Sequence, residues 1–236
     1  MTVFWSFSVI DQELAKAAAC ELNSLLGEKE LEYLNSLRVE KRRSEWLSGR
    51  VALKRLLQAG HSETANRELS EIQIVKMENG APCLLIDNEL QLNKSISLSH
   101  SNKHVFCATA DETNLLGVDL ELIEKRSLVF IQDFFTADEI HQLNLSPSVD
   151  RPFLANLIWS AKEAILKALS LGLTVDTRRI NIQPGSSITS LPGWNSLGFT
   201  MDQDRKDLHL YWRRENEFVL TVCVTEHPPV RFVQLD

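Results

Sequence analysis

The spacing of apolar residues along the chain predicts two successive series of helices and strands. The apolar stretch from Met1 to Ile10 predicts a first strand. Apolar positions then recur at helical spacing, with Gly27 ending one helix and Gly60 the next. Short β-type runs follow, and we expect them to form an antiparallel meander. The predicted helices cover residues 13–26 and 28–58, and the predicted strands cover residues 72–75, 83–86, 95–99 and 105–110.

A polar stretch at residues 111–114 separates the two series and predicts a domain boundary, with one domain at 1–112 and the other at 113–236. The second series begins with a strand at 115–120. Helices followed by strands, twice over, predict an α+β fold. The later helices are expected at residues 128–143 and 153–171, and the later strands near residues 179–182, 197–201, 208–212 and 218–224.

Composition narrows the class of protein. The 236 residues are 44% apolar and 24% charged, which is typical of a globular protein. The net charge of −7 argues against a nucleic-acid binder, and charged residues interrupt every hydrophobic run before it could cross a bilayer. The N-terminal stretch lacks the basic region of a signal peptide, and the four cysteines form no C-x-x-C pair. We therefore expect a cytoplasmic protein that binds neither membrane nor nucleic acid.

One segment is basic although the chain as a whole is acidic. It suits either a solvated helix face or a surface that binds phosphate or an acidic partner. Its positive residues are Arg38, Lys41, Arg42, Arg43, Arg50, Lys54 and Arg55.

Asp119 and Glu121 lie two residues apart in the apolar run Gly117-Val-Asp-Leu-Glu. On a strand, residues i and i+2 point to one face. Two adjacent carboxylates repel each other unless a cation compensates, so Mg²⁺ is a natural ligand for them. Two exposed acids on an edge strand would give the same pattern.

Trp159, Glu163 and Lys167 follow one another at i, i+4 and i+8 in the segment Trp-Ser-Ala-Lys-Glu-Ala-Ile-Leu-Lys. On a helix they form one stripe, which we expect to border a cleft or solvent because the apolar residues of the segment lie on another face. An ordinary helical Glu–Lys pair is the simpler interpretation.

The segment Ser97-Leu-Ser99-His100-Ser-Asn102 is expected to be a polar turn between two strands. It offers hydroxyls, an imidazole and backbone N–H groups to an anion. A plain hairpin turn explains the same residues.

In this order and spacing, the segments resemble the Sfp-type 4'-phosphopantetheinyl transferases. The family signature couples a G-[IV]-D-[IV]-E strand with a W-x-x-K-E-x-x-x-K helix, and both are present in full. The resemblance covers roughly residues 38–170 and includes the Ser97–His100 segment, residues 134–139 and the basic helix. The chain departs from the family at Ala81, where many members have a lysine near the 3'-phosphate of coenzyme A.

The resemblance implies a fold and an activity. The fold is a pseudo-dimer of two similar α+β halves, with coenzyme A in the cleft between them. The activity is transfer of the 4'-phosphopantetheine group of coenzyme A to a serine of an apo acyl or peptidyl carrier protein, with release of adenosine 3',5'-bisphosphate. The reaction needs Mg²⁺, and the chain is expected to act as a monomer.

The same resemblance implies roles for the metal-site residues. Asp119, Glu121 and Glu163 would hold Mg²⁺, which would also bind oxygens of the coenzyme A pyrophosphate. Asp119 would in addition be one of the residues that bind coenzyme A. Glu163 would also be the base that takes the serine proton, directly or through water. Lys167 would stabilise the leaving group, with Lys162 as a second candidate, and both would contact coenzyme A.

The resemblance also implies binding residues outside the metal site. Guanidinium and hydroxyl groups suit phosphate oxygens. The residues expected at the nucleotide are Arg43, Arg50, Ser99 and His100, and those expected at the carrier protein are Phe134 and Phe135.

Two other functions fit the same residues. A Mg²⁺-dependent phosphohydrolase would direct water instead of a serine at the phosphate. A non-catalytic protein that binds coenzyme A or a carrier would keep the cleft without turnover. Transfer of phosphopantetheine to a carrier separates the three.

Overall fold

The computed structural model describes residues 1–18, 20–77, 80–111, 115–185, 193–202, 207–225 and 230–235. The chain forms two compact units, Met1–Leu116 with Pro229–Asp236 (unit 1) and Gly117–Pro228 (unit 2). The predicted boundary between residues 112 and 113 lies outside the described residues. The chain's last segment belongs to unit 1 and not, as predicted, to the second domain. The reason is strand β12 (Arg231–Gln234), which pairs in parallel with β1 (Thr2–Val9).

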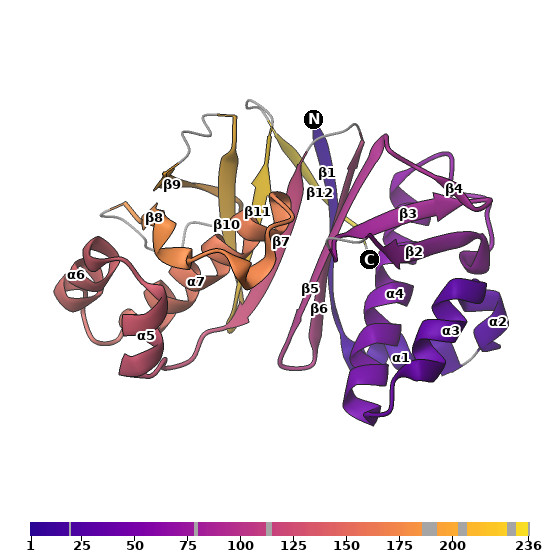
Figure 1. Cartoon of the computed structure of the whole chain (residues 1–236), viewed down its shortest axis with the longest axis horizontal. Helices are drawn as coiled ribbons and strands as arrows, with labels where there is room; N and C mark the ends of the chain where they lie inside the picture. The colour runs from indigo at the N-terminus through magenta and orange to yellow at the C-terminus, as the bar shows by residue number, and fades with distance from the viewer. Residues whose placement is uncertain are drawn as a thin grey trace. The chain divides into compact units, whose positions relative to one another are not determined.

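Unit 1 contains two sheets (Figure 1). The first has the order β12-β1-β6-β5, with β5 at Lys94–Ser101 and β6 at His104–Asp111. The second contains β2 (Ile72–Lys76), β3 (Pro82–Ile86) and the short β4 (Glu89–Leu90), which was not predicted. The prediction of one meander is therefore wrong. Asp87 and Asn88, both at positive φ, turn the chain so that β4 pairs with β3, and β5 then starts in the other sheet.

The helices of unit 1 are shorter than predicted. Residues 13–26 fall into α1 (Ile10–Ala18) and α2 (Leu22–Leu25), and residues 28–58 fall into α3 (Glu28–Ser36) and α4 (Glu40–Gly60). The break before α4 has a clear cause, because the Arg43 guanidinium donates to the carbonyl oxygens of Leu34 and Leu37 at the end of α3. The apolar face of α4 then packs into the core of the unit with residues of β2, β3, β5 and β6.

Unit 2 is built on one five-stranded sheet with the order β7-β11-β10-β9-β8 (Figure 1). Three helices precede strands β8–β11, so the α+β class is confirmed. The strands are β7 (Leu116–Leu122), β8 (Ile180–Gln183), β9 (Asn195–Met201), β10 (His209–Glu215) and β11 (Phe218–Val224), and the helices are α5 (Leu128–Phe134), α6 (Ala137–Leu145) and α7 (Arg151–Ala168).

Residues 128–143 form two helices where one was predicted. Thr136 ends the first and caps the second, because its hydroxyl accepts from Glu139 N while the Glu139 carboxylate accepts from Thr136 N. Helix α7 is buried along most of its length and packs on β11, where the hydroxyls of Ser160 and Thr221 are 2.8 Å apart. Among the described residues, no helix combines the length and the apolar character that crossing a membrane requires.

Candidate active site

The backbones of β7 and α7 lie almost in contact, and Gly117 makes this possible. A Cβ at residue 117 would lie 3.0 Å from the Cα of Ala168, and closer still to the backbone oxygen of Ala164 and the nitrogen of Ala168. Two residues further along β7, Asp119 is buried, and its Oδ1 accepts from Lys167 Nζ of α7 at 2.7 Å. The glycine therefore brings the two sequence motifs together within unit 2.

Three carboxylates influence one another at this place. Burial raises the pKa of Glu121 to about 7, and the charge of Asp119 adds to that rise. Burial, followed by the charge of Asp119, likewise raises the pKa of Glu163. Opposing these shifts, Arg126 Nη2 donates to Glu121 Oε2 at 2.6 Å, and Lys167 lowers the pKa of Glu163. The charge of Asp119 thus acts on both glutamates in a largely buried site.

The donor set fits a hard divalent cation. Mg²⁺ prefers carboxylate oxygens, and a cation among the three carboxylates would compensate the charge of Asp119, which together with burial raises the pKa values of Glu121 and Glu163. Lys167 and Arg126 also bring positive charge to the carboxylates, through ion pairs with Asp119 and Glu121. Within the described ranges, no three acidic, histidine or cysteine side chains already form a group that could hold a metal ion.

The predicted stripe on α7 is only partly exposed. Glu163 and Lys167 are half-buried, but Trp159 is 8% exposed and its ring packs against Phe130 and Phe134. The expectation that Trp159 borders a cleft is therefore wrong. It lies in the aromatic cluster between α5 and α7 and helps to lower the pKa of Glu121 through a hydrogen bond.

Lys162 does not fit the predicted contact with coenzyme A. Its side chain is fully buried, and its ammonium pairs with Glu139 Oε2 at 2.8 Å. The same Nζ donates to the carbonyl oxygens of Phe134 and Thr177 at 3.0 and 3.1 Å. All three ammonium donors are used inside unit 2, so Lys162 is part of the framework of the site.

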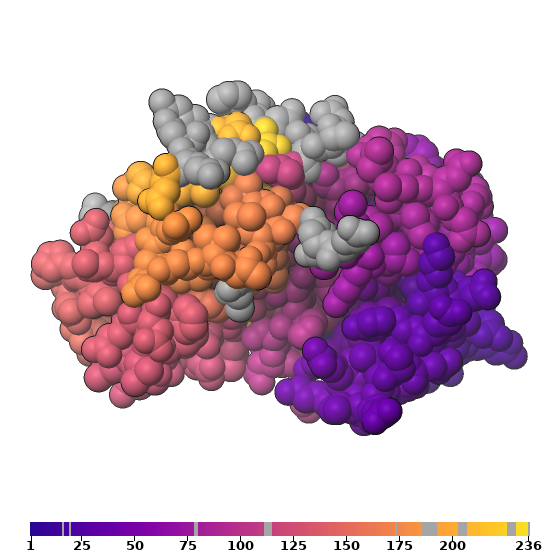
Figure 2. All heavy atoms as spheres, viewed as in Figure 1, coloured from indigo at the N-terminus to yellow at the C-terminus, as the bar shows by residue number. Residues whose placement is uncertain are grey.

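The two phenylalanines predicted at the carrier surface differ. Phe135 is 2% exposed, and the Lys162 ammonium lies 5.5 Å from its ring centroid, so the prediction for Phe135 is wrong. Phe134 is half-buried. Figure 2 shows the α5–α6 segment, in pink, at the surface of unit 2, where Leu128 and Leu145 are more than 70% exposed.

The two arginines of unit 1 that were predicted to bind the nucleotide differ in their hydrogen bonds. Arg50 is 4% exposed, stacks on Trp46 at 4.9 Å, and has a buried Nε that no described group accepts from. Burial lowers the pKa of Arg50, and the charge of Glu30 opposes that shift. Arg43 instead holds the end of α3 through two carbonyl groups. Arg50 is the arginine whose buried charge suits an anion.

The basic segment is not one continuous exposed patch. Lys54 is fully buried and pairs with Glu30 at 2.5 Å, and Arg55 Nη1 lies 3.4 Å from Glu13 Oε2. Lys41 remains largely exposed. Opposite charges from α1 and α3 therefore neutralise part of the segment.

Ser99 and His100 lie inside strand β5 and not in the predicted turn. The turn follows the end of β5 and lies at Asn102 and Lys103, both at positive φ. Alternation along the strand buries Ser99 and leaves His100 exposed. The two side chains therefore point to opposite faces of the sheet.

Two residues of unit 2 were missed as parts of the site, Arg126 and Glu139. Arg126 lies in a short polar loop without a recognisable pattern. Glu139 does have a signal, because Thr136-x-x-Glu139 is a capping-box sequence ahead of an apolar run.

Comparison with known proteins supports one family. Residues 115–223 match the model of the 4'-phosphopantetheinyl transferase superfamily. The chain is 24% identical over 240 residues to a phosphopantetheinyl transferase of Thraustochytrium sp., a match that covers 94% of this chain and 78% of that protein. It is 33% identical over 100 residues to the 4'-phosphopantetheinyl transferase psf-1 of Bacillus pumilus, which covers 41% of this chain and 42% of that one.

Two solved structures of holo-[acyl-carrier-protein] synthases are weakly similar. The Thermotoga maritima protein has 16% identity and a TM-score of 0.39, covering 48% of this chain and 63% of that chain. The Bacillus anthracis protein, in complex with coenzyme A (3',5'-ADP), has 19% identity and a TM-score of 0.39, covering 48% and 96%.

Proposed function

We propose that this chain, whose residues 115–223 match the model of the 4'-phosphopantetheinyl transferase superfamily, acts through the carboxylate site of unit 2. The enzyme transfers the 4'-phosphopantetheine group of coenzyme A to a serine of an acyl or peptidyl carrier protein. One observation carries the site assignment. Burial, together with the charge of the buried Asp119, raises the pKa values of Glu121 and Glu163, and Asp119 also pairs with the ammonium of Lys167. Such a site needs a cation and can offer a base, which are the two requirements of this phosphoryl transfer.

Asp119, Glu121 and Glu163 are the proposed Mg²⁺ ligands. The ion, when bound, would neutralise charge on the pyrophosphate of coenzyme A and orient it for attack. Lys167 currently pairs with Asp119 at 2.7 Å and is half-exposed. Its ammonium can therefore turn from the carboxylate toward phosphate oxygens without leaving the site.

Two side chains of this chain act on the reacting groups: Glu163 at the serine hydroxyl and Lys167 at the leaving group. The serine oxygen of the carrier bonds to the β-phosphorus of coenzyme A while the bond from that phosphorus to the bridging oxygen breaks. Glu163 takes the serine proton, directly or through one water, and the raised pKa of its carboxylate favours that role. Adenosine 3',5'-bisphosphate leaves with the electron pair, and Lys167 stabilises the added negative charge.

Unit 1 supplies the proposed contacts to the nucleotide. Arg50 is the first of these, because its buried guanidinium retains an Nε donor that described groups leave unused. Ser99 and His100 are placed on opposite faces of β5, so a phosphate on one face would contact only one of them. Arg43 is the least suited, since it already donates to two carbonyl groups.

The carrier protein is proposed to dock on α5 and α6. The segment exposes apolar side chains at Leu128, Val129 and Leu145, and Phe134 at the end of α5 is half-buried. One chain suffices for this proposal, because all the residues named lie in it. None of the four cysteines, all within the described ranges, forms a disulfide, which suits the reducing cytoplasm.

The proposal is tested by incubating the chain with coenzyme A, Mg²⁺ and a panel of apo carrier proteins, then measuring the intact mass of each carrier. We expect a mass gain of one phosphopantetheine group that EDTA abolishes. Glu163→Gln should abolish it as well, since the amide can neither take the proton nor bind the metal as a carboxylate does. Asp202→Asn, which changes an exposed carboxylate elsewhere in unit 2, is the matched control and should keep full activity.

Three outcomes separate the alternatives. Modified carrier that depends on Mg²⁺ and Glu163 supports the transferase and its site. Release of adenosine 3',5'-bisphosphate without carrier modification indicates a phosphohydrolase. Coenzyme A binding with neither product indicates a non-catalytic binding protein.

A further inference from the structure

Both units contain a buried lysine–glutamate pair with the same bonds to a helix cap, to a strand N–H and to a carbonyl two residues before the cap. In unit 2, Glu139 is the third residue of α6; its Oε2 accepts from Thr136 N and from Lys162 Nζ, and its Oε1 accepts from Ile182 N of β8. Lys162 Nζ also donates to Phe134 O, two residues before the cap. Helix α7 is thus tied to α5, α6 and β8 at one point.

In unit 1, Glu30 is the third residue of α3. Its Oε2 accepts from Gly27 N and Lys54 Nζ, and its Oε1 accepts from Ile74 N of β2. Lys54 Nζ also donates to Leu25 O, again two residues before the cap. We call each Lys–Glu pair with these bonds a clamp. The correspondence pairs α4 with α7 and β2 with β8.

A second contact aligns the strands. In unit 2 the strand residue Gly117 lies against Ala168 of α7, and in unit 1 Phe4 of β1 lies against Gly60 of α4. Gly60 and Ala168 each follow the clamp lysine by six residues, so Phe4 corresponds to Gly117. In unit 2 the glycine is on the strand and the larger residue is on the helix, whereas in unit 1 the glycine is on the helix and the larger residue is on the strand.

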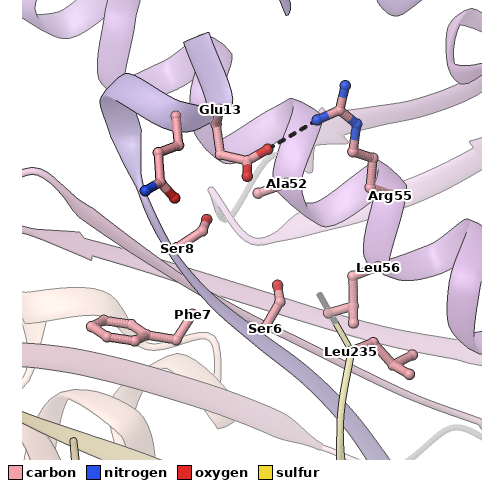
Figure 3. Close-up of a pocket in the computed structure, with 9 residues that line it drawn as sticks. Ser6, Phe7, Ser8, Glu13, Ala52, Arg55, Leu56 and Leu235 are labelled. Atoms are coloured by element: carbon pink, nitrogen blue, oxygen red, sulfur yellow. Dashed lines mark hydrogen bonds and ion pairs between the residues drawn. The ribbon is translucent and has the colours of Figure 1, made fainter. Parts of the chain in front are cut away.

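This alignment compares the two sites next to the clamps. Asp119 and Glu121 correspond to Ser6 and Ser8 of β1, and Glu163 corresponds to Arg55 of α4. Figure 3 shows the two serines pointing toward α1 and α4, around a cavity of about 240 Å³ where Arg55 pairs with Glu13. The same framework thus presents carboxylates in unit 2 and hydroxyls with a guanidinium in unit 1.

A clamp of this kind fixes geometry more than it adds stability. Both partners are fully buried in each unit, and a buried ion pair is often no more stable than an apolar pair of the same volume. What Lys162 does provide is three directed bonds to three segments. A rotation of α7 by about 10° would move a carboxylate about 6 Å from the helix axis by about 1 Å.

From these contacts we infer that Lys162 and Glu139 are positioning residues for the reaction. The pair sets the rotation of α7 so that Glu163, the next residue, and Lys167 face Asp119. The inference rests on the proposed function of the carboxylate site, and it assigns to the pair no contact with substrate. Lys54 and Glu30 form the matched pair without metal ligands beside it.

The test measures Mn²⁺ binding and thermal unfolding for two double variants, Lys162→Met with Glu139→Gln, and Lys54→Met with Glu30→Gln. Both are expected to unfold at a lower temperature than the parent, because backbone carbonyl groups that accept from each lysine would lose their donor. Only the first should bind Mn²⁺ at least tenfold more weakly while folded, the usual cost of losing a group that orients a metal ligand. The second should bind within twofold of the parent. If the first double variant does not fold, Glu139→Gln alone, which keeps the volume of the side chain, takes its place.

Glu163→Gln, measured in parallel, separates two kinds of failure. If it weakens Mn²⁺ binding and the Lys162–Glu139 variant does not, the clamp is structural only and the inference is overturned. Equal losses in both double variants would overturn it too. If Glu163→Gln leaves Mn²⁺ binding unchanged, the proposed metal site is wrong and the clamp cannot act through it.

Discussion

Replacing Gly117 by alanine tests how closely the two motifs must approach. The added Cβ would overlap the backbone of Ala164 and Ala168 in α7, where no flexible side chain can move aside. Ordinary contacts need more than 3 Å, so α7 must move away from β7 by about 1 Å or more. Overpacking of this kind costs about 3 kcal/mol, the upper end of the usual range.

That cost has two measurable consequences. A loss of about 3 kcal/mol lowers the melting temperature by about 6–12 °C in a protein of this size. The shift also separates Glu163 and Lys167 from Asp119, and a misplacement of about 1 Å can reduce the rate about a hundredfold. Melting is followed by circular dichroism, and transfer by single-turnover mass spectrometry well below the melting temperature.

Gly198→Ala is the matched control for this prediction. Gly198 lies on β9 in the same unit, and a Cβ there would meet Gln183 at an ordinary 3.5 Å. We expect no loss of stability or activity. A Gly117→Ala variant that melts within about 2 °C of the parent and transfers at the parental rate would refute the reasoning, since the two backbones would then not constrain each other.

Three further predictions follow from the site. Arg50→Ala should weaken coenzyme A binding about tenfold or more in calorimetry, as loss of a charged hydrogen bond would; unchanged affinity would exclude Arg50 from the nucleotide site. In the metal-free chain, Glu121 binds more protons folded than unfolded between pH 4.5 and about 7, so its contribution to stability in urea titrations should fall as pH rises through that window, and Mg²⁺ should reduce the fall. Phe135→Ala should cost about 3–5 kcal/mol of stability, whereas Phe134→Ala should mainly raise the KM for the carrier.

The long, strongly patterned elements were predictable from sequence. The strand at residues 218–224 and the helix α7 appear where apolar periodicity places them. Strand β12 could not be found in this way, because four residues at one end of the chain pair with β1 at the other end. Breaks between helices were also missed where an arginine or a capping threonine decides them locally.

The chemistry of single residues was harder to predict than the fold. Helix α7 is buried around most of its circumference, so helical periodicity does not show which polar residues face inward. Lys162 therefore looked equivalent to Lys167, although one is fully buried and the other half-exposed. Likewise, Lys54 counted toward a basic surface because its partner, Glu30, comes 24 residues earlier.

The repeated clamp explains how one framework can serve two purposes. Both units keep the buried Lys–Glu pair, whereas the residue after the lysine differs, being Arg55 in unit 1 and Glu163 in unit 2. Ser6, Ser8 and Arg55 provide no carboxylate at the positions that correspond to the three proposed ligands, and the Glu13 carboxylate that lines the cavity is paired with Arg55. We therefore expect the proposed Mg²⁺ to bind in unit 2, where the residue after the clamp lysine is Glu163, and not in unit 1, where it is Arg55.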